Sequence, residues 1–164
     1  MRTAEDRAIQ RDRMRFIKNS LCSNLAILGI LFNVFYFVSI YKSDVGTYYY
    51  NITIGASIVY NLIFMLAVFL SSEGVKNYKK GYSFLLAVIG ALQIVRIFHI
   101  PMKAHAAVVT VAGEAVTVMP NGQFTWVVAC LGLSAACLVA SAVVNFIRCS
   151  ELEAHLKSLG TQDA

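Results

Sequence analysis

One arginine, Arg96, interrupts an otherwise uncharged apolar segment and is the residue in this sequence best suited to chemistry. Gln93 precedes it by three positions, and His99 and Lys103 follow at three and seven positions. If the helix continues past Pro101, these side chains lie roughly along one side, because residues three and four apart are neighbours on a helix. The pattern indicates an outward-facing electropositive patch that binds an anion or an acidic lipid headgroup.

Arg96 also has a purely structural interpretation, which the sequence favours over an anion site. A charge inside a membrane helix is costly unless it reaches water or finds a partner. Arg96 lies about one and a half helical turns before Pro101, so its guanidinium can extend to the outer interface. There it would hydrogen-bond to loop carbonyls or pair with Asp44 or Glu114.

Two asparagines, Asn33 and Asn61, fall near the middle of the first two apolar segments. An amide in lipid must find a partner, so both should face other helices. They are either interhelical hydrogen-bond partners or part of a polar pathway. No acid lies inside the apolar segments, which argues against a proton or cation relay. The candidate ligand-binding residues are therefore Arg96, Gln93, His99, Lys103, Asn33 and Asn61.

The composition supplies a membrane-spanning scaffold for these side chains. The 164-residue chain is 58% hydrophobic and 14% charged, whereas a soluble domain is roughly 45–50% apolar and roughly 25% charged. A bilayer core of about 30 Å needs about 20 helical residues, and apolar windows of this length predict transmembrane helices at residues 19–41, 51–71, 81–101 and 124–147. The predicted fold is an all-α integral membrane protein, a four-helix transmembrane bundle that forms one domain over residues 1–164.

The placement of lysine and arginine predicts the orientation of the helices. Six of these residues lie in positions 1–18, three lie between the second and third helices, and two lie in positions 148–164. Only Lys42 and Lys103 lie on the other side. Both termini are therefore expected in the cytoplasm, with a charged leader helix at residues 1–18 and a tail at residues 148–164.

The longest loop, residues 102–123, is expected outside the cytoplasm. Its runs Val108–Val111 and Ala115–Val118 are rich in β-branched residues, and the short gap between them contains a glycine. This pattern predicts a short extracytoplasmic β-hairpin between the third and fourth helices. Residues 120–122, Pro-Asn-Gly, predict a turn before the last helix, which is expected to start near Phe124.

Small residues recur at a spacing of four on the last helix, at Gly132, Ala136 and Ala140. This spacing lets helix backbones approach closely. Gly29 on the first helix and Gly55 on the second offer similar grooves. These five residues are the candidate helix-packing positions, either inside one bundle or between subunits of an oligomer.

Several function classes lack the residues that they need. The chain has no nucleophile–base pair, phosphate-binding loop, HExxH sequence or paired carboxylates, so we expect no enzyme activity. Its four cysteines show no zinc-type or disulfide pattern, and we expect no metal or cofactor. The net charge of +5 lies in short blocks between apolar runs, which suits membrane topology and not nucleic-acid binding.

The leading functional hypothesis is a non-enzymatic membrane protein that acts by helix association. It would be an accessory subunit of a membrane complex or a homo-oligomer, with membrane lipids and other membrane subunits as its partners. The alternative is a small oligomeric transporter or channel for an anion or a polar small molecule. In that case Arg96, Gln93, Asn33 and Asn61 would line the pathway.

Overall fold

Within the described residues, four helices are long and apolar enough to cross a membrane, which confirms the prediction of four such helices. The computed structural model describes residues 18–41, 52–111 and 114–160. Within them the elements are α2 (Ser20–Tyr41), α4 (Ile52–Lys76), α5 (Gly81–His99), α6 (Pro101–Ala106), β1 (Val108–Val111), β2 (Glu114–Thr117) and α7 (Asn121–Gly160).

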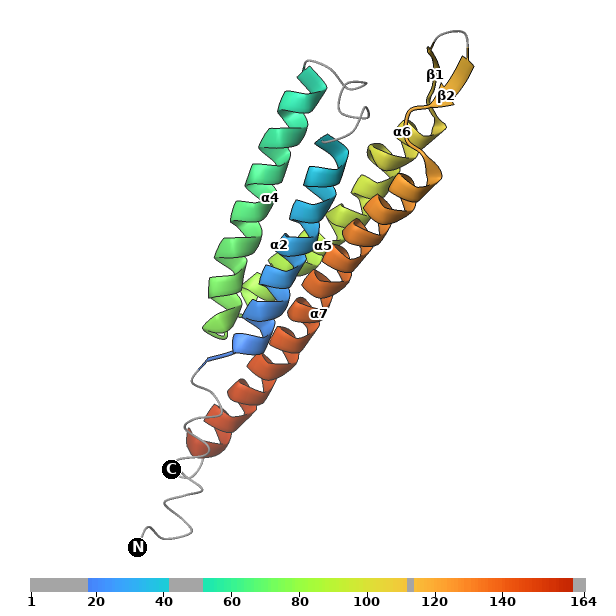
Figure 1. Ribbon diagram of the computed structural model, residues 1–164. Helices are drawn as coiled ribbons and strands as arrows, with labels where there is room; N and C mark the ends of the chain where they lie inside the picture. The colour runs from blue at the N-terminus through green and yellow to red at the C-terminus, as the bar shows by residue number, and fades with distance from the viewer. Residues whose placement is uncertain (1–17, 42–51, 112–113, 161–164) are drawn as a thin grey trace, which may run out of the picture.

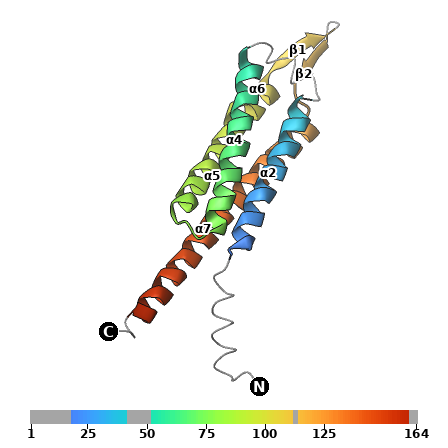
Figure 2. The same ribbon diagram turned by 90° about the vertical axis from the view of Figure 1, so that its left-hand side faces the viewer.

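Helix α7 is the helix on which most of the bundle packs. It is the longest described helix, with 40 residues, and both α2 and α5 pack extensively along it (Figures 1 and 2). Helix α4 packs on α2 and less extensively on α5, so it lies at the edge of the bundle. This arrangement leaves one flank, between α4 and α5, less tightly closed than the rest.

The bundle has two distinct ends. At the end called here the turn end, residues 77–80 connect α4 to α5, and α2 begins beside them. The backbone N–H of Asn19 donates to the carbonyl of Lys76, which ties these segments together at 3.0 Å. The opposite end, the strand end, holds α6, β1 and β2 (Figure 1). Helix α7 runs between both ends and extends beyond the turn end (Figures 1 and 2).

The outward surface of the bundle is apolar, as lipid requires. Large side chains such as Phe84, Val95 and Ile63 are 76%, 61% and 61% exposed. Exposed apolar side chains are stable against lipid tails, which are equally apolar. Polar side chains find hydrogen-bond partners only in the interior of the bundle. The buried polar residues include Asn19, Asn33, Asn61, Gln93, Ser134, Ser141 and Asn145.

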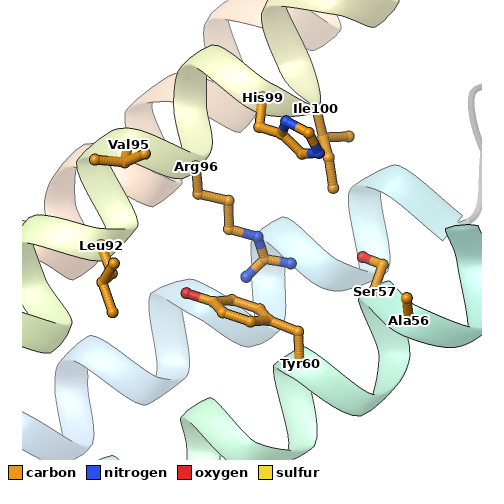
Figure 3. Close-up of a pocket in the computed structure, with 8 residues that line it drawn as sticks. All are labelled: Ala56, Ser57, Tyr60, Leu92, Val95, Arg96, His99 and Ile100. Carbon is orange, nitrogen blue, oxygen red and sulfur yellow. The ribbon is translucent and has the colours of Figure 1, made fainter.

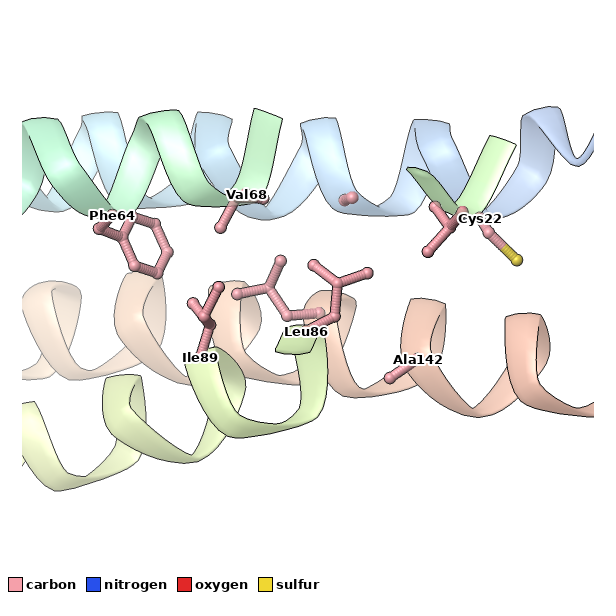
Figure 4. Close-up of a cluster of buried hydrophobic side chains, with 9 residues drawn as sticks. Cys22, Phe64, Val68, Leu86, Ile89 and Ala142 are labelled. Atoms are coloured by element: carbon pink, nitrogen blue, oxygen red, sulfur yellow. The ribbon is translucent and has the colours of Figure 1, made fainter. Parts of the chain in front are cut away.

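A cluster of buried hydrophobic side chains joins all four long helices toward the turn end. Figure 4 shows Cys22 of α2, Phe64 and Val68 of α4, and Leu86 of α5 in this cluster. Ala142 contributes from α7. In a membrane this packing stabilises mainly through van der Waals contact, because lipid tails are as apolar as the core.

Hydrogen bonds from α7 fix its two main neighbours. The Ser141 hydroxyl donates to the Cys22 carbonyl at 2.7 Å, and the Ser134 hydroxyl donates to the Gly29 carbonyl at 2.8 Å. Near the turn end, Asn145 donates to the Ser83 hydroxyl at 2.7 Å. Polar side chains therefore set the positions of α2 and α5 along α7.

The predicted helix boundaries change at both ends of the last helix. Helix α7 begins at Asn121 and not near Phe124, because Pro120 precedes the helix and the first-turn N–H groups need no helical partner. It also continues through the predicted tail to Gly160, because the tail contains good helix formers and no proline. Of the predicted leader helix, residues 1–18, all but Lys18 lie outside the described residues.

Two further boundaries differ from the prediction. Helix α4 continues to Lys76, five residues past the predicted end. Helix α5 ends at His99, and Pro101 starts the short helix α6 inside the predicted loop. Proline lacks an N–H and its ring fits the first position of a helix, which explains a new start there.

The small sheet at the strand end consists of β1 and β2. The strands pair antiparallel, with Val108 opposite Thr117 and Val111 opposite Glu114. Each strand has four residues. The backbone N–H of Val118 then donates to the Ala107 carbonyl at 3.0 Å, which connects the sheet to the end of α6.

Only one of the candidate packing glycines lies at a close helix contact. A Cβ on Gly29 would lie 3.0 Å from Leu138 Cδ2, so its absence lets α2 and α7 approach closely. A Cβ on Gly55 or Gly132 would meet nothing within 4 Å. Ala136 and Ala140 are exposed.

Within the described part of the chain, these four residues therefore show no close packing inside the bundle, and the alternative, packing between subunits, stays a prediction. Spacing places Gly132, Ala136 and Ala140 on one face, but it does not say whether that face meets another helix. Gly90 was not singled out in the sequence, and it does lie at a close contact. A Cβ there would lie 2.9 Å from Val139 Cγ2.

Candidate functional site: a buried arginine among amides

Helix α5 directs Gln93 and Arg96 into the bundle. Its buried residues recur every three or four positions from Ser83 through Leu86 and Ile89, and Gln93 and Arg96 continue the same face. The helical period therefore carries two polar side chains onto a face that is otherwise packed against α7 and α2. Arg96 is only 6% exposed.

The Arg96 guanidinium is held by asparagines from two other helices. Its Nη1 donates to Asn61 Oδ1 of α4 at 2.9 Å and to Asn33 Oδ1 of α2 at 3.3 Å. Both amides are fully or almost fully buried. The prediction that Asn33 and Asn61 face the bundle is thus confirmed, and three helices meet at one charge.

The amides also bind one another. Gln93 Nε2 donates to Asn33 Oδ1 at 2.9 Å, and Asn33 Nδ2 donates to Asn61 Oδ1 at 3.3 Å. Asn61 Nδ2 donates to the Ser57 carbonyl at 2.8 Å, and Gln93 Nε2 lies 3.4 Å from the Ser134 hydroxyl of α7. We call Asn33, Asn61, Gln93 and Arg96 the arginine–amide cluster.

Two tyrosine rings flank the guanidinium. The Arg96 Cζ lies 4.5 Å from the centroid of the Tyr36 ring and 4.9 Å from that of Tyr60. Such cation–π contacts strengthen when the cation is desolvated. The sequence reasoning missed both tyrosines and Ser134. Each of these three residues has a polar side chain well inside an apolar segment. The same feature identified Asn33 and Asn61, and it would have identified these three as well.

The cluster does not neutralise the charge that it holds. Its other members are neutral amides, and no carboxylate among the described residues forms an ion pair with Arg96. Nη2 of Arg96 and Oε1 of Gln93 are buried without a hydrogen-bond partner. Buried polar atoms of this kind are rare because each loses its hydration without compensation. The site therefore has an unused donor and an unused acceptor.

A pocket of about 400 Å³ lies beside the guanidinium, between α4 and α5. Figure 3 shows the guanidinium extending from α5 toward Tyr60 and Ser57 of α4, with His99 next to it. The pocket is lined by Ala56, Ser57, Tyr60, Leu92, Val95, Arg96, His99 and Ile100.

The interpretation of Arg96 as an arginine that extends to the outer interface is wrong. Its bonds are to amides inside the bundle and not to loop carbonyls. Glu114 is exposed on β2 and makes no ion pair with Arg96, while Asp44 lies outside the described residues. An arginine side chain is long enough to turn either way, and here the asparagines provide the nearer partners.

The predicted electropositive row along the third helix divides into two parts. Gln93 and Arg96 are buried, whereas His99 and Lys103 are exposed. His99 still lines the pocket beside Arg96, but Lys103 is not among the lining residues. The new helix start at Pro101 explains only the position of Lys103, which belongs to α6 and no longer follows the face of α5.

The fold and the cluster together define a class: this is a multi-pass membrane protein with a buried arginine–amide cluster beside a lateral pocket. Comparison with family models, with curated proteins and with solved structures gives no match. The described residues contain no group of three His, Cys, Asp or Glu side chains that could hold a metal ion. The geometry of the cluster is thus the basis for functional inference.

Replacing Asn61 by leucine tests whether the amides support the buried charge. The variant Asn61→Leu removes the nearest acceptor of Arg96, and we expect it to lower the free energy of unfolding by about 2–4 kcal/mol. In an Arg96→Met background the same change should cost less, with a coupling energy of about 1–3 kcal/mol, because no charge is left without its partner. Reversible unfolding of the purified protein in mild detergent measures both values.

The matched control for this cycle is Asn24→Leu, the same substitution at an exposed position of α2. It should leave the free energy of unfolding nearly unchanged. Equal costs of Asn61→Leu with and without Arg96 would show that the amide does not support the charge.

Proposed function

We propose that this protein is a non-enzymatic membrane protein that binds an anionic group at Arg96, in the pocket between α4 and α5. One observation supports the proposal: Arg96 is buried, and its Nη2 has no hydrogen-bond partner. A buried charge that is not neutralised is costly. A bound anion supplies both the missing acceptor and the opposite charge, through a charge-assisted hydrogen bond.

The position of the pocket favours binding from the side of the bundle. Its lining comes from α4, which lies at the edge of the bundle and packs on α2 and α5, and from the end of α5 next to α6. A transporter or channel for an anion would need this same site at some step. Binding at Arg96 is therefore the part of the transport hypothesis that the geometry supports.

Arg96→Gln tests the proposal, because it removes the charge and keeps a hydrogen-bonding side chain. We expect the wild-type protein to bind at least one of acetate, inorganic phosphate and dodecanoate, and the variant to bind it about 10–100 times more weakly. Isothermal titration of protein reconstituted in zwitterionic lipid nanodiscs measures the affinities. Both proteins should first show the same cooperative unfolding.

Lys103→Gln is the matched control, because Lys103 is exposed and does not line the pocket. It should bind the anion as the wild type does. If Arg96→Gln does not fold, Arg96→Lys keeps the charge without the planar guanidinium and should retain part of the affinity. Equal affinity in the wild type and Arg96→Gln would refute the proposal.

We also propose that the turn end of the bundle faces the cytoplasm. Lys76, Lys79 and Lys80 lie at this end, whereas Lys103 lies at the strand end. Basic residues are enriched on the cytoplasmic side of membrane proteins. Both termini would then be cytoplasmic, and β1 and β2 would form an extracytoplasmic hairpin.

Fusions to the two termini test this orientation. A reporter that is active only in the cytoplasm should be active at either terminus, because an even number of spans separates the two. A reporter that is active only outside the cytoplasm should be inactive at both. Activity on opposite sides would contradict the proposed topology.

Association with a second copy or with another membrane subunit is a second candidate function. Gly132 has open space where a Cβ would lie, and Ala136 and Ala140 are exposed on the same face of α7. Small residues four apart form a flat groove in which another helix can approach closely. This face of α7 is thus available for contacts outside the chain.

Ala136→Leu fills this groove and should lower self-association by about tenfold or more in the apparent dissociation constant. Energy transfer between labelled copies in liposomes measures this change. Ala91→Leu, at an exposed position of α5, is the control and should associate as the wild type does. If the wild-type protein remains monomeric at all protein-to-lipid ratios, the hypothesis of self-association is excluded. Co-purification would then test whether the protein binds another membrane subunit.

A further inference from the structure

We infer that the anion bound beside Arg96 is the carboxylate of a hydrophobic monocarboxylic acid, whose apolar tail lies between α4 and α5 and extends into the lipid. This inference rests on the proposed function and adds the chemical class of the ligand. It follows from the charge of the site, from the chemistry of the pocket lining, and from the side on which the pocket opens.

The charge of the site fits a monoanion. Arg96 is the permanently charged side chain of the pocket, and its hydrogen-bond partners Asn33 and Asn61 are neutral. One carboxylate brings the net charge to zero. A phosphate monoester with two negative charges would leave one charge unbalanced in a medium of low dielectric constant, at a large cost in desolvation.

The polar groups around the guanidinium fit a small head. Ser57 and His99 line the same pocket as the guanidinium (Figure 3). The Ser57 hydroxyl and the unused N–H groups of Arg96 Nη2 can donate to the two oxygens of one carboxylate. A larger polar head would need more partners than these residues supply, because each buried polar atom must be satisfied.

The rest of the pocket fits an apolar tail. Half of its lining residues are alanine or aliphatic side chains, and Val95 is 61% exposed on the outer surface. Val59 and Ile63 of α4 continue this apolar exposed surface along the neighbouring helix. A hydrocarbon chain can therefore leave the pocket directly into lipid. The aliphatic lining residues are Ala56, Leu92, Val95 and Ile100.

The burial of Arg96 separates this ligand from a phospholipid headgroup. Arg96 is only 6% exposed and lies three positions before the end of α5. A phospholipid phosphate carries polar ester and headgroup atoms, which would have to enter the pocket with it. A carboxylate at the end of a hydrocarbon chain brings no such atoms, so fewer polar groups need partners beside Arg96.

Tyr60 is the side chain that a ligand must displace. Tyr36 on one side of the guanidinium is fully buried, whereas Tyr60 on the other side is 37% exposed and lines the pocket. The ring of Tyr60 thus covers one side of the guanidinium and is itself partly exposed in the pocket. We expect a carboxylate that enters from the pocket to displace this ring, while Nη1 keeps its bonds to the amides.

Four probes test the inference on the full-length protein in phosphatidylcholine nanodiscs: dodecanoate, acetate, dodecanol and dodecyl phosphate. Empty nanodiscs correct for partition into lipid. We expect dodecanoate to bind at least about ten times more tightly than each of the others, because it alone combines one negative charge with an apolar tail. Adding phosphatidylglycerol to the nanodiscs should leave this affinity unchanged after correction.

Ala56→Phe tests the position of the tail, because it places a large side chain in the apolar part of the pocket. It should weaken dodecanoate binding about tenfold or more and leave acetate binding unchanged. Ala129→Phe makes the same change on an exposed position of α7 and should alter neither. Equal effects of the two variants would overturn the assignment of the tail.

The outcomes separate the ligand class from the function. If acetate, dodecyl phosphate or phosphatidylglycerol binds as tightly as dodecanoate and Arg96→Gln abolishes that binding, the inferred ligand class is wrong and the anion site stands. If dodecanol binds as tightly as dodecanoate, if neither these probes nor inorganic phosphate binds, or if binding does not depend on Arg96, both proposals are wrong.

Discussion

A positive charge held inside the bundle by neutral amides is the interaction on which the rest of this structure depends. The Arg96 guanidinium binds Asn61 of α4 and Asn33 of α2, so a residue of α5 connects two other helices. Amide dipoles lower the cost of burying the charge, but they do not cancel it. The position of α4 is tied to this contact, because α4 otherwise packs only on the edge of the bundle.

The long helix α7 explains why this charge lies beside a pocket and not in a closed core. It uses serine and asparagine side chains to bind α2 and α5, and these contacts close the side of the bundle that faces α7. Helix α4 makes no comparable contact with α7 among the described residues, and the space between α4 and α5 contains a pocket with the guanidinium at its inner wall. In a membrane, lipid tails would contact the outer side of this pocket, so the guanidinium at the inner wall and the hydrocarbon outside border the same space.

The apolar windows predicted the four described helices that are long and apolar enough to cross a membrane. This succeeds because hydrocarbon excludes unpaired charges and unpaired backbone groups, so a spanning helix must be a long uncharged segment of the sequence. The same rule predicted that Asn33 and Asn61 face other helices. It did not predict the direction of Arg96, because distance from a helix end says how far a side chain can reach and not where its nearest partners lie. The spacing of Gly132 and Ala136 left open whether they pack inside the bundle or against another subunit, for a similar reason: helical spacing defines a face but not its neighbour.

The sequence by itself determined the class of scaffold, the buried polar residues of the first two helices, and the one charge inside a span. These features follow from the transfer of single residues between water and lipid, which depends on residue type and position along the chain. Only the tertiary structure decided that this charge, two asparagines, a glutamine and two tyrosines share one site next to a pocket. Their contacts join α2, α4 and α5, and the relative rotation of helices is set by packing among all of them, which no single segment contains.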